Sequence, residues 1–114
     1  MPIRRKVFVR GQVQGPTYTQ DTARIAEELK VNGWVRSCDD GSVEACFEGN
    51  RRDVEAIVSW CFIGPKRAVV DEVVVRRRYY RGTLSGFRIL QDNQDLCFRQ
   101  ALPFGNKLRA APTF

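Results

Sequence analysis

Residues 5–30 read RKVFVRGQVQGPTYTQDTARIAEELK, and a change of period within this stretch decides the fold. Charged and apolar residues alternate from Arg5 to Arg10, which is the pattern of a half-buried β-strand. A loop bounded by Gly11 and Gly15 follows. The residues of one helix face then recur at helical spacing between positions 19 and 30, namely Thr22, Ile25, Ala26 and Leu29. The stretch therefore predicts a strand, a glycine-bounded loop and a helix in succession.

The same alternation of strand and helix patterns continues to residue 90. Residues 33–36 and 42–48 predict two short strands joined by a hairpin turn at Asp40-Gly41. A second helix is predicted from Asn50, its expected N-cap, to the helix-ending pair Gly64-Pro65. The valine-rich residues 68–78 predict a long strand, and residues 86–90 a short fifth strand.

The order βαββαβ plus a short final strand indicates an α+β fold of the ferredoxin-like type, with two helices on one face of an antiparallel sheet. The expected core residues are Val7, Val9, Ile25, Leu29, Val43, Phe47, Ile57 and Val73. These elements predict one domain over residues 1–90 and a C-terminal extension over residues 91–114. The extension shows no clear period, and we expect it to be partly docked on the domain and partly flexible.

Composition narrows the possible functions. No apolar run is long enough to span a membrane, and the basic N-terminus lacks the apolar segment of a signal peptide, so a cytoplasmic location is expected. The net charge of +6 favours anionic partners, from phosphorylated metabolites to acidic proteins and nucleic acid. The chain has no histidine, which excludes Ser-His-Asp and Cys-His catalysis. No metal site is expected, and the cysteines are expected to be reduced: Cys38, Cys46, Cys61 and Cys97.

Two blocks of the sequence resemble the acylphosphatase family. The family pattern G-x-V-Q-G-V-x-F-R corresponds here to residues 11–19, GQVQGPTYT. The pattern G-W-V-x-N-x-x-D-G-x-V-E corresponds to residues 33–44, GWVRSCDDGSVE, at the family's own separation. The resemblance covers residues 4–90, and it implies the strand order 4-1-3-2-5.

The resemblance also implies a chemistry, the hydrolysis of acyl phosphates to carboxylate and phosphate without a cofactor or metal. In the family, backbone N–H groups of the first loop hold the phosphate, an arginine neutralises it, and an asparagine positions the attacking water. The loop positions here are Gln14, Gly15, Pro16, Thr17, Tyr18 and Thr19. The arginine position is Thr19, and the asparagine position is Ser37.

These departures argue against the family's activity in this chain. Thr19 carries no charge, Ser37 has a shorter reach than asparagine, and Pro16 has no N–H to donate. Loss of one preorganised donor alone commonly lowers the rate about a hundred- to a thousand-fold. We therefore expect a catalytically impaired or inactive member that works as a small binding or interaction module. The alternatives are an acylphosphatase with residual or altered activity, and a module that binds polyanions or nucleic acid.

The third alternative depends on a cluster of basic residues. In the expected topology the start of the first strand lies beside the end of the fourth, far from the loop at residues 11–19. This brings together Arg4, Arg5, Lys6, Arg76, Arg77, Arg78 and Arg81. A solvated, charged edge that resists sheet-to-sheet aggregation is the favoured explanation of such a cluster. Glu44 and Glu48 are expected on an outward strand face.

Overall fold

The computed structural model of the protein describes residues 1–13, 16–90 and 106–109. Its elements in chain order are β1 (Pro2–Gln12), α1 (Pro16–Leu29), β2 (Asn32–Ser37), β3 (Val43–Asn50), α2 (Arg51–Cys61), β4 (Val69–Arg78), β5 (Phe87–Ile89) and β6 (Asn106–Arg109). The predicted βαββαβ order with a short fifth strand is confirmed.

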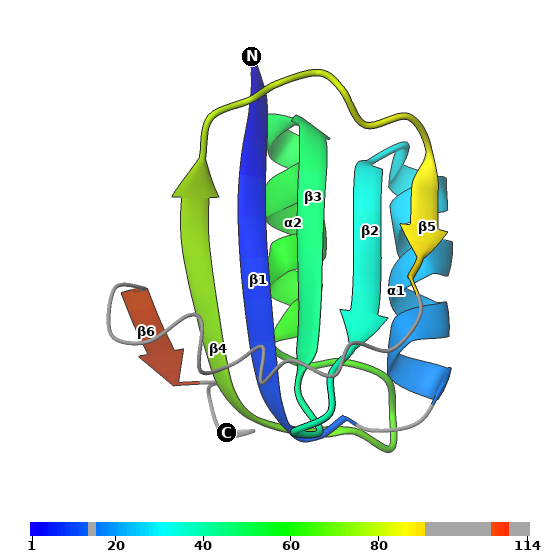
Figure 1. Ribbon diagram of the computed structural model, residues 1–114, viewed down its shortest axis with the longest axis vertical. Coiled ribbons are helices and arrows are strands. Elements are labelled where there is room, and N and C mark those ends of the chain that lie inside the picture. The colour runs from blue at the N-terminus through cyan, green and yellow to red at the C-terminus, as the bar shows by residue number, and fades with distance from the viewer. Residues whose placement is uncertain (14–15, 91–105, 110–114) are drawn as a thin grey trace.

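The strands form one sheet of order β5-β2-β3-β1-β4-β6. This order contains the predicted sequence of five strands and adds β6, which pairs with β4 at the outer edge. Figure 1 shows both helices on the same face of the sheet, α2 behind the central strands and α1 behind β2 and β5. Below, the face opposite the helices is called the open face.

The prediction of an entirely antiparallel sheet is wrong for β5, which runs parallel to β2. The reason lies in the connection from β4 to β5. β4 ends at the same end of the sheet at which β2 begins. Residues 79–86 pass across that end of the sheet to the other side of β2, as Figure 1 shows. A strand that starts there must run in the direction of β2.

The core lies between the helices and the sheet. Six of the predicted core residues are buried, namely Val7, Val9, Val43, Phe47, Ile57 and Val73. Ile25 and Leu29 are half-buried and pack against this cluster from α1. The helix registers read from the sequence are therefore confirmed.

The helix starts show how local chemistry sets the boundaries. The side chain of Asn50 accepts a hydrogen bond from the Arg52 N–H at 3.2 Å, so it caps α2 as predicted. Helix α1 begins three residues earlier than the sequence pattern indicated, at Pro16. Proline suits a first helical position because the N–H that it lacks has no partner within the helix there.

Gly11 marks the place where β1 bends before the loop. The register between β1 and β4 shifts between Arg10 and Gly11, and Gly11 has φ of 144°. A Cβ atom at this position would collide with the backbone carbonyl of Val69. Only glycine allows β1 and β4 to stay this close at the entrance to the loop.

The cysteines differ from the sequence-based expectation at one position. Cys38 is disulfide-bonded, so the expectation of reduced cysteines is wrong there, whereas Cys46 and Cys61 are buried free thiols. Cys97 lies outside the described residues. In the described part of the chain, no helix is both long and apolar enough to cross a membrane.

Candidate functional site

The loop that the sequence singled out joins β1 to the N-terminus of α1. Val13 at its start is buried, Pro16 and Thr17 at its end are exposed, and Gln14 and Gly15 lie outside the described residues. The first N–H groups of a helix have no partner within the helix, and they carry the positive end of its dipole. The first turn of α1 contains no acidic side chain that would repel an anion. Pro16 reduces the number of available donors by one.

Tyr18 anchors this end of α1 in the core. Its side chain is only 2% exposed, and its hydroxyl donates a hydrogen bond to the Cys61 carbonyl at 2.7 Å. Its ring lies 5.4 Å from the ring of Trp60, centroid to centroid. Burial, and then the neighbouring Cys61, raise the pKa of Tyr18 well above its ordinary value. Tyr18 is therefore a neutral group that positions the helix, and it is turned away from any ligand in the loop.

Thr19 also turns inward. It is 5% exposed, and its hydroxyl donates a hydrogen bond to the Pro16 carbonyl at 3.1 Å, within the first turn of α1. The single hydrogen of this hydroxyl is thus directed at the backbone. The side chain brings neither charge nor a free donor to the loop.

Ser37 is the last residue of β2, and it stands opposite Val43 in the hairpin. The turn is held by hydrogen bonds from the Cys38 N–H to the Ser42 carbonyl and from the Gly41 N–H to the Cys38 carbonyl, at 2.9 and 3.0 Å. The Asp40 carboxylate accepts a further bond from the Ser42 N–H at 2.9 Å. The turn at Asp40-Gly41 therefore presents a half-buried serine at its base.

The seven basic residues gather at one end of the sheet, but on two faces of it. The register places Arg4 opposite Arg78, Arg5 opposite Arg77 and Lys6 opposite Arg76. Because side chains alternate along a strand, Arg5 and Arg77 point to the helix side, and the other two pairs point to the open face. Arg4, Lys6, Arg78 and Arg81 line a small cavity of about 190 Å³ together with Tyr79.

Glu44 and Glu48 lie on the open face, the outward strand face on which they were expected, but both carboxylates are buried there. Glu44 is fully buried, with its Oε1 2.7 Å from Arg36 Nε and its Oε2 3.0 Å from Lys6 Nζ. Glu48 is 1% exposed, and it forms an ion pair with Arg4 at 3.5 Å. Its Oε2 also accepts a hydrogen bond from the backbone N–H of Arg81 at 2.9 Å. Lys6 and Arg36 further flank the ring of Trp34, at 5.6 and 5.3 Å from its centroid.

This network weakens the case for a polyanion-binding surface formed by all seven residues. Arg4 and Lys6 are already paired with carboxylates that are themselves buried. A nucleic acid on the open face would have to compete with these internal partners. The sequence contains a signal for the pairing, since Glu44 and Glu48 of β3 lie on the same sheet face as Arg4 and Lys6 of β1, but this becomes readable only once the register is known.

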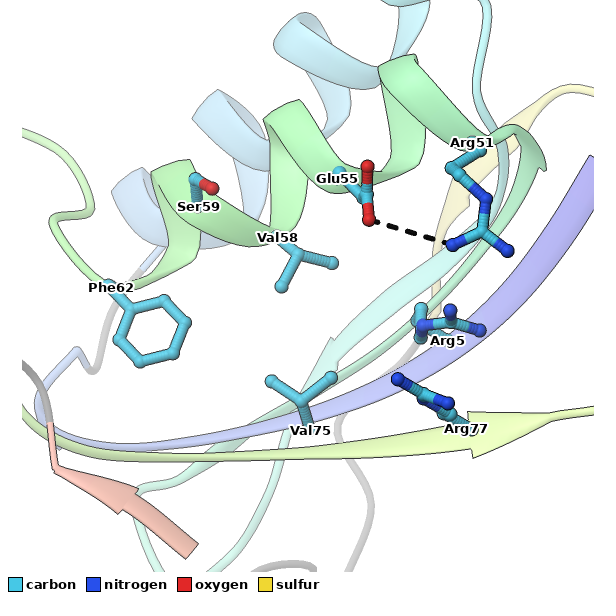
Figure 2. A pocket seen from close by; sticks show the side chains of 8 residues that line it. All are labelled: Arg5, Arg51, Glu55, Val58, Ser59, Phe62, Val75 and Arg77. Carbon is cyan, nitrogen blue, oxygen red and sulfur yellow. Dashed lines mark ion pairs between the residues drawn. The ribbon is translucent and has the colours of Figure 1, made fainter. Parts of the chain in front are cut away.

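The helix side contains a larger cavity that sequence reasoning missed. It has a volume of about 430 Å³ and lies between α2 and the strands β1 and β4. Figure 2 shows three arginines at one end of it, Arg5, Arg51 and Arg77, and Phe62 at the other end. Burial, and then the neighbouring Arg77 and Arg51, lower the pKa of Arg5. Among the described residues, no group of histidine, cysteine or acidic side chains is arranged to hold a metal ion.

Comparison with known proteins identifies relatives along most of the chain. A family model described as Acylphosphatase matches residues 5–89. An acylphosphatase of Geobacter metallireducens is 44% identical over 89 residues, which are 78% of this chain and 96% of that protein. The structure of an acylphosphatase from Coxiella burnetii superposes with a TM-score of 0.73 at 30% identity, covering 78% of this chain and 93% of that one. Full-length HypF, in a phosphate- and nucleotide-bound form, matches with a TM-score of 0.76 at 25% identity, over 84% of this chain and 13% of that one.

Proposed function

This chain belongs to the acylphosphatase family, and we propose that it is a member with little or no hydrolytic activity, which works as a small anion-binding or interaction module. The proposal rests on the two positions where the family's motifs place arginine and asparagine. They are occupied here by Thr19 and Ser37.

The conformation of Thr19 is the observation that carries the proposal. Its hydroxyl is buried and donates to the Pro16 carbonyl, so it cannot take the place of a guanidinium group facing a phosphate. Developing negative charge in the transition state would meet N–H dipoles only, without a full positive charge. Arg10 does not substitute for it, because its guanidinium forms an ion pair with Glu72 on β4.

The remaining parts of the loop support weak anion binding. The N-terminal turn of α1 offers backbone N–H groups at Thr17 and Tyr18, and Tyr18 fixes this turn to the core. The site lacks the charge that catalysis in the family needs, whereas the anchored first turn of α1 supports the binding of a small anion. The alternative is residual acylphosphatase activity, which the 44% identity to an acylphosphatase over nearly its full length favours.

Hydrolysis of benzoyl phosphate tests the proposal. We expect the purified protein to release phosphate near the background rate. The double variant Thr19→Arg with Ser37→Asn should recover measurable turnover, and adding Pro16→Val should raise it further. Each single change should do much less, because charge stabilisation and water placement act in the same transition state.

A matched control separates catalysis from added charge. Gln20→Arg places the same charge on the next, exposed residue of α1, and it should leave turnover at background. Wild-type turnover equal to that of an active family member would contradict the proposal. A correctly folded triple variant without activity would show that substitutions at these positions do not account for the loss.

A further inference from the structure

A cavity lies between α2 and the strands β1 and β4. The end of this cavity that Arg5 and Arg77 line is far from the loop at residues 11–19. The register places Arg5 opposite Arg77, whereas the loop begins where Gly11 faces Val70. One face of α2 lines the cavity along the whole helix, from Arg51 at its first residue to Phe62 just after its last. At a rise of about 1.5 Å per residue this face is about 16 Å long.

The two ends of the cavity differ in chemistry. Figure 2 shows the guanidinium groups of Arg5, Arg51 and Arg77 at one end, Val58 and Val75 in the middle, and Phe62 at the other end with Ser59 on the same side. The volume of about 430 Å³ falls within the range of small-molecule sites. A ligand that fills it must therefore combine an anionic group with an apolar body.

The charged end is not neutralised by the protein. Arg51 forms an ion pair with Glu55 at 3.7 Å, and both side chains are more than half exposed. Arg5 donates a hydrogen bond to the neighbouring Arg4 carbonyl at 3.0 Å. The attraction of Glu55 only partly offsets its burial and the repulsion from Arg77 and Arg51. Like charges directly opposite each other on adjacent strands are unfavourable, and this is the arrangement of Arg5 and Arg77.

From this arrangement we infer that the cavity is a binding site for a phosphate monoester with an apolar tail, separate from the loop at residues 11–19. Three arginines and Glu55 give the lining a net charge of +2, which a phosphate monoester dianion neutralises. Guanidinium groups bind phosphate oxygens through paired hydrogen bonds. The tail then extends along α2 between Val58 and Val75 towards Phe62. This inference does not depend on the proposed loss of hydrolysis.

Calorimetric titration of the full chain with octyl phosphate tests the inference. Above any weak anion binding in the loop at residues 11–19, we expect one tighter site for octyl phosphate, with an affinity at least about tenfold higher than for inorganic phosphate because the apolar tail is buried. Octanoate should bind more weakly than octyl phosphate, since it has a single charge. Octanol should not bind measurably.

Variants locate the site. Arg5→Gln with Arg77→Gln should weaken octyl phosphate binding about tenfold or more, since hydrogen bonds to charged groups are the strong ones. Phe62→Ala should reduce the advantage of octyl phosphate over inorganic phosphate. Arg52→Gln is the matched control. Arg52 follows the cavity-lining Arg51 on α2, but its side chain is 89% exposed and does not line the cavity. Its affinity should stay within about twofold of the wild-type value, as expected for a surface change.

Amide shifts in NMR spectra decide between this cavity and the loop. We expect octyl phosphate to shift the signals of Arg5, Val58 and Arg77. Shifts confined to Thr17, Tyr18 and Thr19 would overturn the inference, as would unchanged binding in the double arginine variant. Equal affinity for octyl phosphate and inorganic phosphate, or for octyl phosphate and octanol, would overturn it too.

Discussion

The two faces of the sheet hold their cations differently at the end where β1 begins and β4 ends. On the open face, Lys6 and Arg4 meet the buried carboxylates of Glu44 and Glu48. On the helix side, Arg5 and Arg77 lie opposite each other, and Glu55 is the one acidic residue among the described residues that line the cavity there. A single strand, β1, supplies cations to both faces because its side chains alternate. Positive charge thus stabilises the structure on one face and remains available to a ligand on the other.

Removing Glu44 should produce the largest effect on stability. In Glu44→Gln, Lys6 and Arg36 lose their common partner at a position that is fully buried. We expect the free energy of unfolding to fall by about 3 kcal/mol, since breaking a buried pair leaves uncompensated charge. Urea unfolding measures it. Glu55→Gln on the helix side is the control, and it should change stability by less than about 1 kcal/mol because its ion pair is exposed. Equal losses in the two variants would remove the contrast between the faces.

Alkaline pH should lower the stability of the protein mainly through a group on the helix side, the buried thiol of Cys61. Burial raises the pKa of the Cys61 thiol from 9.0 to about 12 in the folded protein. This contribution to stability is fully present below pH 9.0 and is lost as the pH rises towards 12, because the unfolded chain ionises first. From this thiol alone we expect a loss of about 1 kcal/mol between pH 8 and pH 10, measured by urea unfolding.

The two buried free thiols sharpen this comparison. Burial also raises the pKa of Cys46, but the neighbouring Arg4 and Lys6 on the open face oppose the shift. Cys61→Ala should therefore flatten the pH dependence more than Cys46→Ala does. The opposite order would mean that the cations of the open face do not reach the thiol.

Removing one arginine from the helix side should have the smallest effect. Arg77→Gln relieves a like-charge contact with Arg5, and we expect stability to change by no more than about 0.5 kcal/mol. Lys6→Gln, on the adjacent position of β1, provides the contrast, because it removes a partner of buried Glu44 and should be clearly destabilising. Thermal unfolding of the two variants in parallel gives the comparison, and a marked loss of stability in Arg77→Gln would mean that this arginine has a structural partner.

Local signals predicted the elements well. The Asn50 cap, the Asp40-Gly41 turn and the helix stripe through Ile57 each depend on neighbours within a few residues. The direction of β5 was missed because it depends on where the chain crosses the sheet, and no local pattern records that.

The site was predictable only as a set of positions. Sequence motifs marked Thr19 and Ser37, but the inward turn of the Thr19 hydroxyl depends on the helix starting at Pro16. The burial of Glu44 depends on Lys6 and Arg36 from two neighbouring strands. The cavity at Arg5, Arg51 and Arg77 combines two strands and a helix, and no single segment of sequence contains it.

The short outer strands have a consequence for self-association. β5 and β6 contain three and four residues, and they pair with the outer sides of β2 and β4. An unpaired strand edge is a template for intermolecular β-pairing. A short edge strand exposes fewer unpaired backbone N–H and C=O groups than a long one. A chain that stopped at Leu90 would keep residues 5–89, the whole of the family match. It would also expose the outer backbone of Glu72 to Val75, where β6 now pairs, to the edge of a second molecule. By pairing with β4, the four residues of β6 thus reduce the backbone that is exposed to edge-to-edge aggregation.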